Sequence, residues 1–211
     1  MATRQVLAEL CSAWEAQGGE PVALESVGGV DAARRVQAGE AFDAVLLASD
    51  AIDKLMAGGH VLAGSRVDLV RSEVAIAVRA GADRPDLSTE AALKQAVLAA
   101  PTLGYSTGPS GVALTKLFER WGIAAEIAPR IVQAPPGVPV GTLVARGDVA
   151  LGFQQLSELL PLEGITIVGG MPPEVAITTI FSGGVCDASP QADAVRRLLA
   201  FMAAPAAADA K

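Results

Sequence analysis

The stretch from Gly104 to Trp121 limits the possible folds of this chain more than any other. Ala99–Tyr105 is a short apolar run typical of a buried strand, and apolar side chains recur at helical spacing from Val112 onward. The turn between them, Ser106–Gly111, is rich in hydroxyl side chains and glycine. A strand that turns directly into a helix leaves backbone N–H groups unpaired at the helix start, and these donors suit an anion.

Two interpretations of this turn stay open. Ser, Thr and Gly are ordinary capping residues, so the turn can be a well-capped helix start without a ligand. The alternative is a loop that binds a small anion through backbone N–H groups and hydroxyls. No lysine follows Gly111, so the pattern differs from the phosphate loop of nucleotide-binding proteins.

The composition predicts a folded protein with a substantial core. The chain has 211 residues, of which 51% are hydrophobic and 18% charged. This length is enough for one large domain or two lobes of about 100 residues each. The net charge is -7, no basic run occurs, and 4% of the residues are aromatic, which argues against nucleic acid or an anionic membrane surface as a partner.

Few residues are available for a metal site. The chain has one histidine, His60, and two cysteines, Cys11 and Cys186, which form no metal-spaced cluster. We therefore expect no metal and no cofactor. The cysteines are free thiols or, as the alternative, a disulfide. His60 follows two glycines after a helical run, which favours a solvated helix end.

Membrane-spanning and targeting patterns are not found. No apolar stretch of about 18 residues or more occurs, so we expect no transmembrane helix. Met1 leads directly into an amphipathic helix instead of a signal peptide. The sequence therefore predicts a cytoplasmic protein if Met1 is the true start.

Strands and helices alternate along the chain, which predicts an α/β class with mostly parallel sheets. Apolar runs predict the strands, and amphipathic spacing predicts the helices. The expected strands are 21–26, 42–48, 66–71, 73–79, 99–105, 127–132, 148–153, 165–168 and 174–181, and the expected helices are 3–17, 31–38, 49–58, 89–98, 112–121, 138–146 and 190–203, with a further helix beginning at 154–158.

Two groups of alternating elements predict two lobes joined by two crossing segments. We expect lobe one to comprise residues 1–80 and 175–211, and lobe two residues 81–174, with hinges near 79–86 and 169–175. In open sheets of this kind, ligands bind beyond the carboxyl ends of the strands, where a turn starts the next helix. These turns predict a ligand site in a cleft between the lobes.

The order of these turns resembles that of periplasmic solute-binding proteins of the molybdate-binding, type II class. The resemblance covers nearly the whole chain and rests on an ordered set of short motifs rather than on one specific motif. The matching motifs are Ser26–Val30 with Arg35–Glu40, Phe42–Asp50, Lys54–Gly58 and Val144–Phe153. The segments G-Y-S-T-G-P-S-G at 104–111 and G-F-Q-Q-L-S-E-L at 152–159 are similar to a branch that handles small organic polyacids and includes aconitate isomerase.

The resemblance implies a monomeric periplasmic protein that captures a small anion in the interlobe cleft for an ABC transporter permease. The anion would be a molybdate-like oxyanion or an organic (poly)carboxylate. The alternative is an enzyme similar to aconitate isomerase, which shifts a double bond in a tricarboxylic acid. Such a reaction needs a base that removes a proton next to a carboxylate and a donor that returns it.

The sequence departs from the family pattern in two places. Members begin with a strand and a serine-bearing loop, whereas this chain begins at the following helix, with Arg4 at its start. Molybdate-binding members use a tyrosine in the second lobe where this chain has Gln154 and Gln155. Arginine and amide donors fit planar carboxylates better.

The candidate ligand contacts are small or hydrogen-bonding residues at the strand-to-helix turns. Their alternative role is a tight turn or a helix cap, and for Gln154 it is a surface amide. Glu158 is the candidate catalytic residue, against the alternative of a solvated carboxylate; His60, Tyr105 and Asp50 are other groups that could transfer protons. The predicted ligand-binding residues are Arg4, Ser26, Gly28, Gly29, Val30, Ser49, Ser106, Thr107, Ser110, Gly111, Val112 and Gln154.

Overall fold

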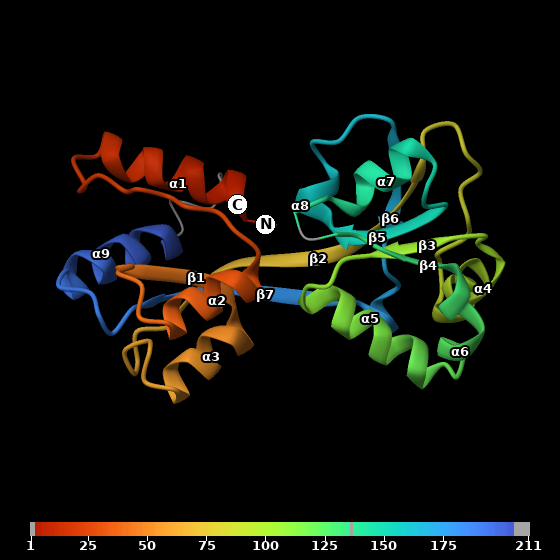
Figure 1. Cartoon of the computed structure of the whole chain (residues 1–211). Helices are drawn as coiled ribbons and strands as arrows, with labels where there is room; N and C mark the ends of the chain where they lie inside the picture. Colours follow the sequence, from red (N-terminus) through yellow and green to blue (C-terminus); the bar gives the residue numbers. More distant parts are fainter. Residues whose placement is uncertain (1–2, 136, 205–211) are drawn as a thin grey trace. The chain divides into compact units, whose positions relative to one another are not determined.

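The computed structural model describes residues 3–135 and 137–204 (Figure 1). The chain divides into two compact units. Unit 1 comprises Met1–Arg71 and Ile180–Lys211, and unit 2 comprises Ser72–Thr179. The chain passes from one unit to the other within two strands, β2 (Val67–Arg79) and β7 (Thr178–Val185).

Unit 1 is built on antiparallel strands. Strand β1 (Ala44–Ala48) pairs with β7 so that Ala48 lies opposite Phe181, and β7 lies between β1 and β2 in the sheet order. The helices of this unit are α1 (Arg4–Ala16), α2 (Gly29–Gln37), α3 (Ser49–Ala57) and α9 (Ala192–Ala203).

Alternate side chains of β1 face two different helix layers. Val45 and Leu47 pack with α2 and α3, whereas Ala44 and Leu46 pack against the apolar cluster of α1 and α9. Figure 1 shows these two helix pairs on opposite sides of β1. The alternation follows from strand geometry, because successive side chains point to opposite faces.

Unit 2 combines parallel and antiparallel strand pairs. Strands β3 (Leu103–Tyr105), β4 (Ile131–Gln133) and β5 (Leu151–Gln155) run parallel, whereas β2 pairs antiparallel with β5 and with β6 (Ile165–Gly170). The helices are α4 (Glu90–Ala99), α5 (Pro109–Arg120), α6 (Ala124–Ile127), α7 (Val140–Arg146) and α8 (Leu156–Leu159), with 3-10 turns at Ala128–Arg130 and Pro173–Val175.

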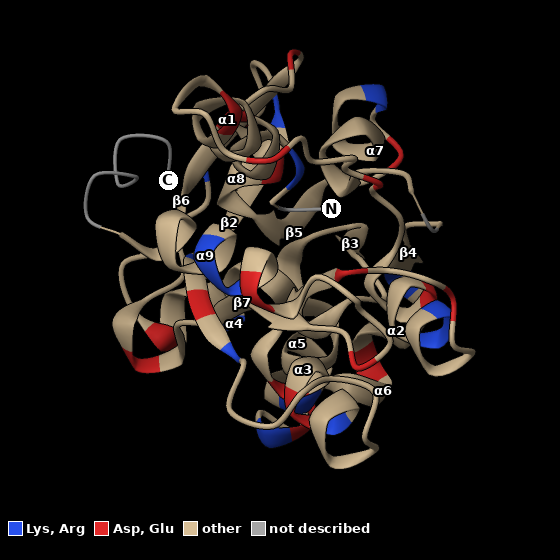
Figure 2. Cartoon of the chain, turned by 90° about the vertical axis from the view of Figure 1, so that its left-hand side faces the viewer, with Lys and Arg blue, Asp and Glu red and all other residues tan. Residues whose placement is uncertain are grey.

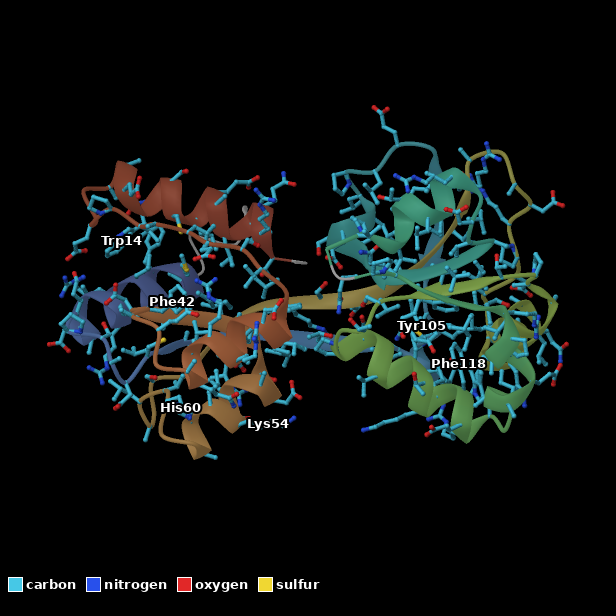
Figure 3. All side chains as sticks on the ribbon, in the orientation of Figure 1. Trp14, Phe42, Lys54, His60, Tyr105 and Phe118 are labelled. Atoms are coloured by element: carbon cyan, nitrogen blue, oxygen red, sulfur yellow. The ribbon has the colours of Figure 1, made fainter. Side chains whose placement is uncertain are left out.

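Both faces of the sheet in unit 2 are covered. On one face, the Phe118 ring centroid of α5 lies 6.2 Å from those of Tyr105 and Phe153. Tyr105 and Phe118 are labelled inside this unit in Figure 3. On the other face, α7 packs so closely that a Cβ atom at Gly152 would lie 2.5 Å from Val144. This packing fixes where the strands end relative to the helices that follow them.

The predicted α/β class is confirmed, and the predicted parallel arrangement is met only in part. Among the described strand pairs, β3–β4 and β3–β5 are parallel, and β1–β7, β2–β5 and β2–β6 are antiparallel. The expectation of mostly parallel sheets was therefore too broad. It was drawn from the alternation of elements, which does not determine the direction of the long strands β2 and β7.

The predicted strand at 21–26 is wrong. Residues 19–28 have no regular secondary structure. Their backbone finds side-chain partners instead: the Val22 N–H donates to Glu15 Oε1 at 2.7 Å, and Trp14 Nε1 donates to the Glu20 carbonyl oxygen at 3.0 Å.

Four other predicted strands also differ from the structure. The strand expected at 174–181 instead runs from Thr178 to Val185, after a 3-10 turn at Pro173–Val175. The strands expected at 66–71 and 73–79 form one continuous strand, β2, because Ser72 is buried within the sheet and makes no turn. The strand expected at 127–132 is replaced by the end of α6, a 3-10 turn and the short strand β4.

The described helices do not include one that is long and apolar enough to cross a membrane. Figure 2 shows Lys and Arg on several separate elements, interspersed with Asp and Glu. The described elements therefore carry mixed charge.

Candidate functional site

The carboxyl ends of three strands lie at one edge of the sheet in unit 2. Leu103 of β3 lies opposite Leu151 of β5, and Tyr105 lies opposite Gln133 of β4. All three strands are parallel, so the turns that follow them leave the sheet on the same side. This edge brings together two groups of predicted contacts, the turn Ser106–Val112 and Gln154.

The turn after β3 folds back tightly on the start of α5. The Gly108 N–H donates to Ser106 Oγ at 3.3 Å, and Gly108 then serves as the N-cap residue in an extended conformation. Gly111 has no room for a side chain, because an added Cβ atom would lie 1.8 Å from the Ser106 carbonyl oxygen. Thr107 is exposed in the same turn. Glycine is therefore needed here for close approach of two backbone segments.

Ser110 is the most informative residue of this turn. It is 6% exposed, and its hydroxyl forms no hydrogen bond with any residue in the described ranges. The Ser110 oxygen is not one of the fully buried atoms without a partner, which among the described residues is Gln155 Oε1, so the hydroxyl reaches solvent. The hydroxyl is thus a donor available at the start of a twelve-residue helix.

The backbone donors beside Ser110 can be assigned from the helix geometry. Pro109 has no N–H, and the N–H groups of Ser110 and Gly111 lie in the first turn, where helical carbonyl partners are missing. The Val112 N–H already donates to the Gly108 carbonyl oxygen at 3.1 Å. Of the predicted contacts on α5, Ser110 and Gly111 therefore offer backbone donors, whereas the Val112 amide is already used.

Gln154 is buried and fixed by α7. Its side chain is 3% exposed, and Oε1 accepts a hydrogen bond of 3.0 Å from the Gly141 N–H, at the second residue of α7. Because the carbonyl oxygen is occupied in this way, the Nε2 donors are left for another acceptor. Sequence reasoning missed the contact with Gly141, since nothing local pairs two residues that are 13 positions apart.

Gln155 points to the opposite face of β5 from Gln154. Its Nε2 donates to Thr179 Oγ1 at 2.8 Å, and both side chains are buried. Gln155 Oε1 is a buried oxygen that lacks a hydrogen-bond partner among the described residues. The adjacent glutamines therefore have different surroundings, although the sequence analysis had considered them together.

In unit 1, the first turns of α2 and α3 both lie at the carboxyl end of β1. Gly28 is the N-cap residue of α2, and a Cβ atom at Gly29 would lie 3.5 Å from Leu47 Cδ2. Ser49 directly follows β1 as the first residue of α3. Val30, in the first turn of α2, is 77% exposed. Ser26 precedes this turn; it is half-buried and has an interaction partner.

Arg4 begins α1 at the same end of β1. The residue before it, Thr3, lies beside Leu46 and Phe181. Phe181 is paired with Ala48, the last residue of β1. The exposed Arg4 side chain therefore starts close to this strand end within unit 1.

The groups considered for proton transfer are dispersed. Tyr105 is buried in the aromatic cluster, and Glu158 lies on α8 with an interaction partner. Asp50 is exposed at the start of α3 and lies 3.7 Å from the Lys54 ammonium group. His60 follows the other end of α3 and lines a pocket of about 130 Å³ with Cys186. Within the described ranges, no group of three or more His, Cys, Asp or Glu side chains could hold a metal ion.

The chain belongs to the family described as bacterial extracellular solute-binding proteins, which matches it over residues 1–211. Within that class, it is similar to an aconitate isomerase from a Pseudomonas species, with 42% identity over 177 residues, 83% of this chain and 67% of that protein. The predicted resemblance to type II binding proteins is thereby confirmed.

Solved structures show the same fold. The periplasmic molybdate-binding protein of Azotobacter vinelandii aligns with a TM-score of 0.78 and 19% identity, covering 99% of this chain and 92% of that one. The tungstate ABC transporter protein of Geobacter sulfurreducens aligns with a TM-score of 0.73 and 16% identity, covering 100% of this chain and 94% of that one. At these identities the likeness concerns the fold alone.

Proposed function

We propose that this solute-binding protein binds a small anion at the carboxyl edge of β3 and β5 in unit 2. The observation that carries the proposal is the Ser110 hydroxyl, which lacks a partner among the described residues although Ser110 is 6% exposed. It lies at the positive end of the α5 dipole, beside the N–H groups of Ser110 and Gly111. The Nε2 group of Gln154 adds a neutral donor at the neighbouring strand end.

An organic carboxylate is the anion we favour over a tetrahedral oxyanion. An amide group donates in one plane, which suits a planar carboxylate. The relative at 42% identity is named for aconitate, a carboxylic acid. The other proposed ligand contacts are Arg4, Ser26, Gly28, Gly29, Val30, Ser49, Ser106 and Thr107, through hydroxyl, guanidinium or N–H groups.

A ligand screen tests this proposal. Binding should raise the melting temperature in proportion to the logarithm of ligand concentration for at least one of molybdate, tungstate, sulfate, citrate, cis-aconitate and trans-aconitate. Calorimetric titration of Ser110→Ala should then show affinity about 10- to 100-fold weaker, since a hydrogen bond to a charged group is lost. Ser12→Ala, on the exposed face of α1, is the control and should bind as wild type. No shift with any of these anions, or equal binding by Ser110→Ala, would contradict the proposal.

We further propose that the protein acts as a monomer in the periplasm and presents its ligand to an ABC transporter permease. The family description as extracellular solute-binding proteins supports this role, and the fold is shared with a periplasmic molybdate-binding protein and a tungstate ABC transporter protein. Cells lacking the gene should lose uptake of the anion identified in the screen. Unchanged uptake would argue for another role.

Isomerisation is the second candidate function, favoured by the 42% identity to an aconitate isomerase. Glu158, three residues after Gln155 on α8, is the proposed base that would remove a proton next to a carboxylate. Proton spectra of trans-aconitate mixed with the protein should show a second isomer, and Glu158→Gln should abolish the conversion. An unchanged spectrum with wild-type protein rejects the enzyme and leaves the binding proposal intact.

A further inference from the structure

The segment before α2 is held to unit 1 by side chains rather than by a sheet. Residues 19–28 lack regular structure, yet they carry Ser26 and lead into the donor turn at Gly28–Val30. The contacts from Trp14 to the Glu20 carbonyl and from Val22 to Glu15 hold the first part of the segment. A different side chain, Arg35 of α2, contacts the part next to the donor turn, through Glu25.

Arg35 binds two carboxylates and an aromatic ring at once. Its Nη2 and Nη1 atoms lie 3.2 and 2.5 Å from the two carboxylate oxygens of Glu25, and its Nε donates to Glu40 Oε2 at 2.7 Å. The guanidinium carbon lies 4.8 Å from the centroid of the Phe42 ring, which is labelled within unit 1 in Figure 3. Glu40 and Phe42 fix the arginine, so its fork is directed at Glu25, the residue before Ser26.

We propose that Arg35 is a positioning residue that sets the conformation of Ser26–Val30. The Arg35 side chain is 26% exposed and Glu25 54% exposed. Ion pairs this exposed contribute little to global stability. The Arg35–Glu25 pair instead restrains residues 19–28, which have no hydrogen bonds to a sheet. Releasing Glu25 leaves residues that must be ordered again when a ligand binds, and this ordering weakens binding.

The chain provides a closely matched control. Arg34 is the neighbouring residue on α2, but its side chain is 74% exposed, and its ion-pair partner among the described residues is Asp31, at 3.0 Å on the same helix. Arg34→Gln removes the same charge as Arg35→Gln without touching the anchored segment. Arg35→Lys keeps the charge but cannot reproduce the two-pronged contact or the ring stacking.

Backbone order parameters of residues 24–30, from NMR relaxation of the whole protein, give the decisive test. In Arg35→Gln, these order parameters should fall from about 0.85 to below about 0.6, with the urea midpoint nearly unchanged. Arg35→Lys should be intermediate, Arg34→Gln should behave as wild type, and Glu25→Gln should match Arg35→Gln, with no further fall in the double variant. Unchanged order parameters in Arg35→Gln, or an equal fall in Arg34→Gln, would overturn the proposal.

A ligand measurement extends the test to function, and this arm rests on the function proposed above. Titration with citrate and with molybdate should show affinity about three- to thirtyfold weaker for Arg35→Gln than for Arg34→Gln with whichever anion binds wild type. Lower order parameters together with unchanged affinity would overturn the role of Arg35 in ligand binding. If wild type binds neither anion, the proposed function fails for these probes, while the order parameters still decide whether Arg35 holds the segment.

Discussion

Gln154 Oε1 accepts a hydrogen bond of 3.0 Å from the Gly141 backbone N–H, and this buried contact joins the end of β5 to the first turn of α7. Gly141 is held so close to its neighbours that an added Cβ atom would lie 2.5 Å from Leu162 Cδ1. The side-chain amide of Gln154 therefore caps the N-terminus of α7. Gln154 also lies at the edge of the sheet where we propose that the anion binds. Its Oε1 would then hold α7 while its Nε2 contacts the ligand.

Replacing Gln154 with leucine should lower the free energy of unfolding by about 1–3 kcal/mol, because the buried Gly141 N–H loses its acceptor. Urea denaturation measures the change. Gln133→Leu, at an exposed position at the end of β4 in the same sheet, is the control and should stay within about 0.5 kcal/mol of wild type. Similar losses for the two variants would show that the contact with Gly141 has no special weight.

Gly111→Ala should destabilise the protein by about 1–3 kcal/mol or more, because its Cβ atom would overlap the Ser106 carbonyl oxygen, which is backbone and cannot rotate away. We expect a lower urea midpoint and weaker binding of any anion found in the screen, since the start of α5 has to shift. Gly170→Ala serves for comparison, as a Cβ atom there meets nothing within 4 Å. A Gly111→Ala protein as stable as Gly170→Ala would contradict the geometry of this turn.

Features set by neighbouring residues were predictable from the sequence. A helix was expected over 89–98, and the structure caps it with Thr89, whose Oγ1 accepts the Ala92 N–H at 3.1 Å. A helix was expected over 138–146, and it ends before Gly147, which has a φ of 87°. In both cases the chemistry lies within a few residues, so local sequence determines it.

Features set by distant partners were not predictable. The run at 21–26 has strand-like residues, but the Val22 N–H is bound by Glu15, and Trp14 binds the Glu20 carbonyl just before the run. Arg35 was not among the predicted site residues, because its partner Glu25 lies outside the helix that carries it. The free hydroxyl of Ser110 is likewise visible only once α5 is packed on the sheet. The site residues chosen from the sequence stay predictions until a ligand is bound.

Ser182→Ala should reduce stability in a pH-dependent way. Ser182 Oγ donates to Asp68 Oδ1 at 2.6 Å, and this hydrogen bond, followed by the charge and hydrogen bond of Arg66, lowers the pKa of Asp68. A carboxyl group with a lowered folded pKa stabilises the protein above its unfolded pKa, about 3.9, and loses that effect as pH falls through the folded value.

Urea unfolding of wild type and Ser182→Ala should therefore differ by about 0.5–1 kcal/mol near pH 7, a small value because Asp68 is half exposed. The difference should shrink below about pH 4 as Asp68 becomes protonated. Ser12→Ala should show no such trend. A difference between wild type and Ser182→Ala that stays constant with pH would argue against coupling to Asp68.

The two thiols should be free and unusually weak acids. Cys11 and Cys186 are 6% and 2% exposed and lie in separate apolar clusters of unit 1. Burial raises the pKa of both thiols. For Cys186, the Asp43 carboxylate contributes further, and the pKa of this thiol rises to about 11.

Cys186 also lines the pocket of about 130 Å³ beside His60, so a small reagent can come near it. Because the thiolate is the reactive form, ionisation should then limit its alkylation. In Cys11→Ser, the rate with iodoacetamide should rise about tenfold per pH unit from about pH 7 to 10 without levelling. A plateau near the ordinary thiol pKa, or the loss of both free thiols in wild type through a disulfide, would contradict this arrangement.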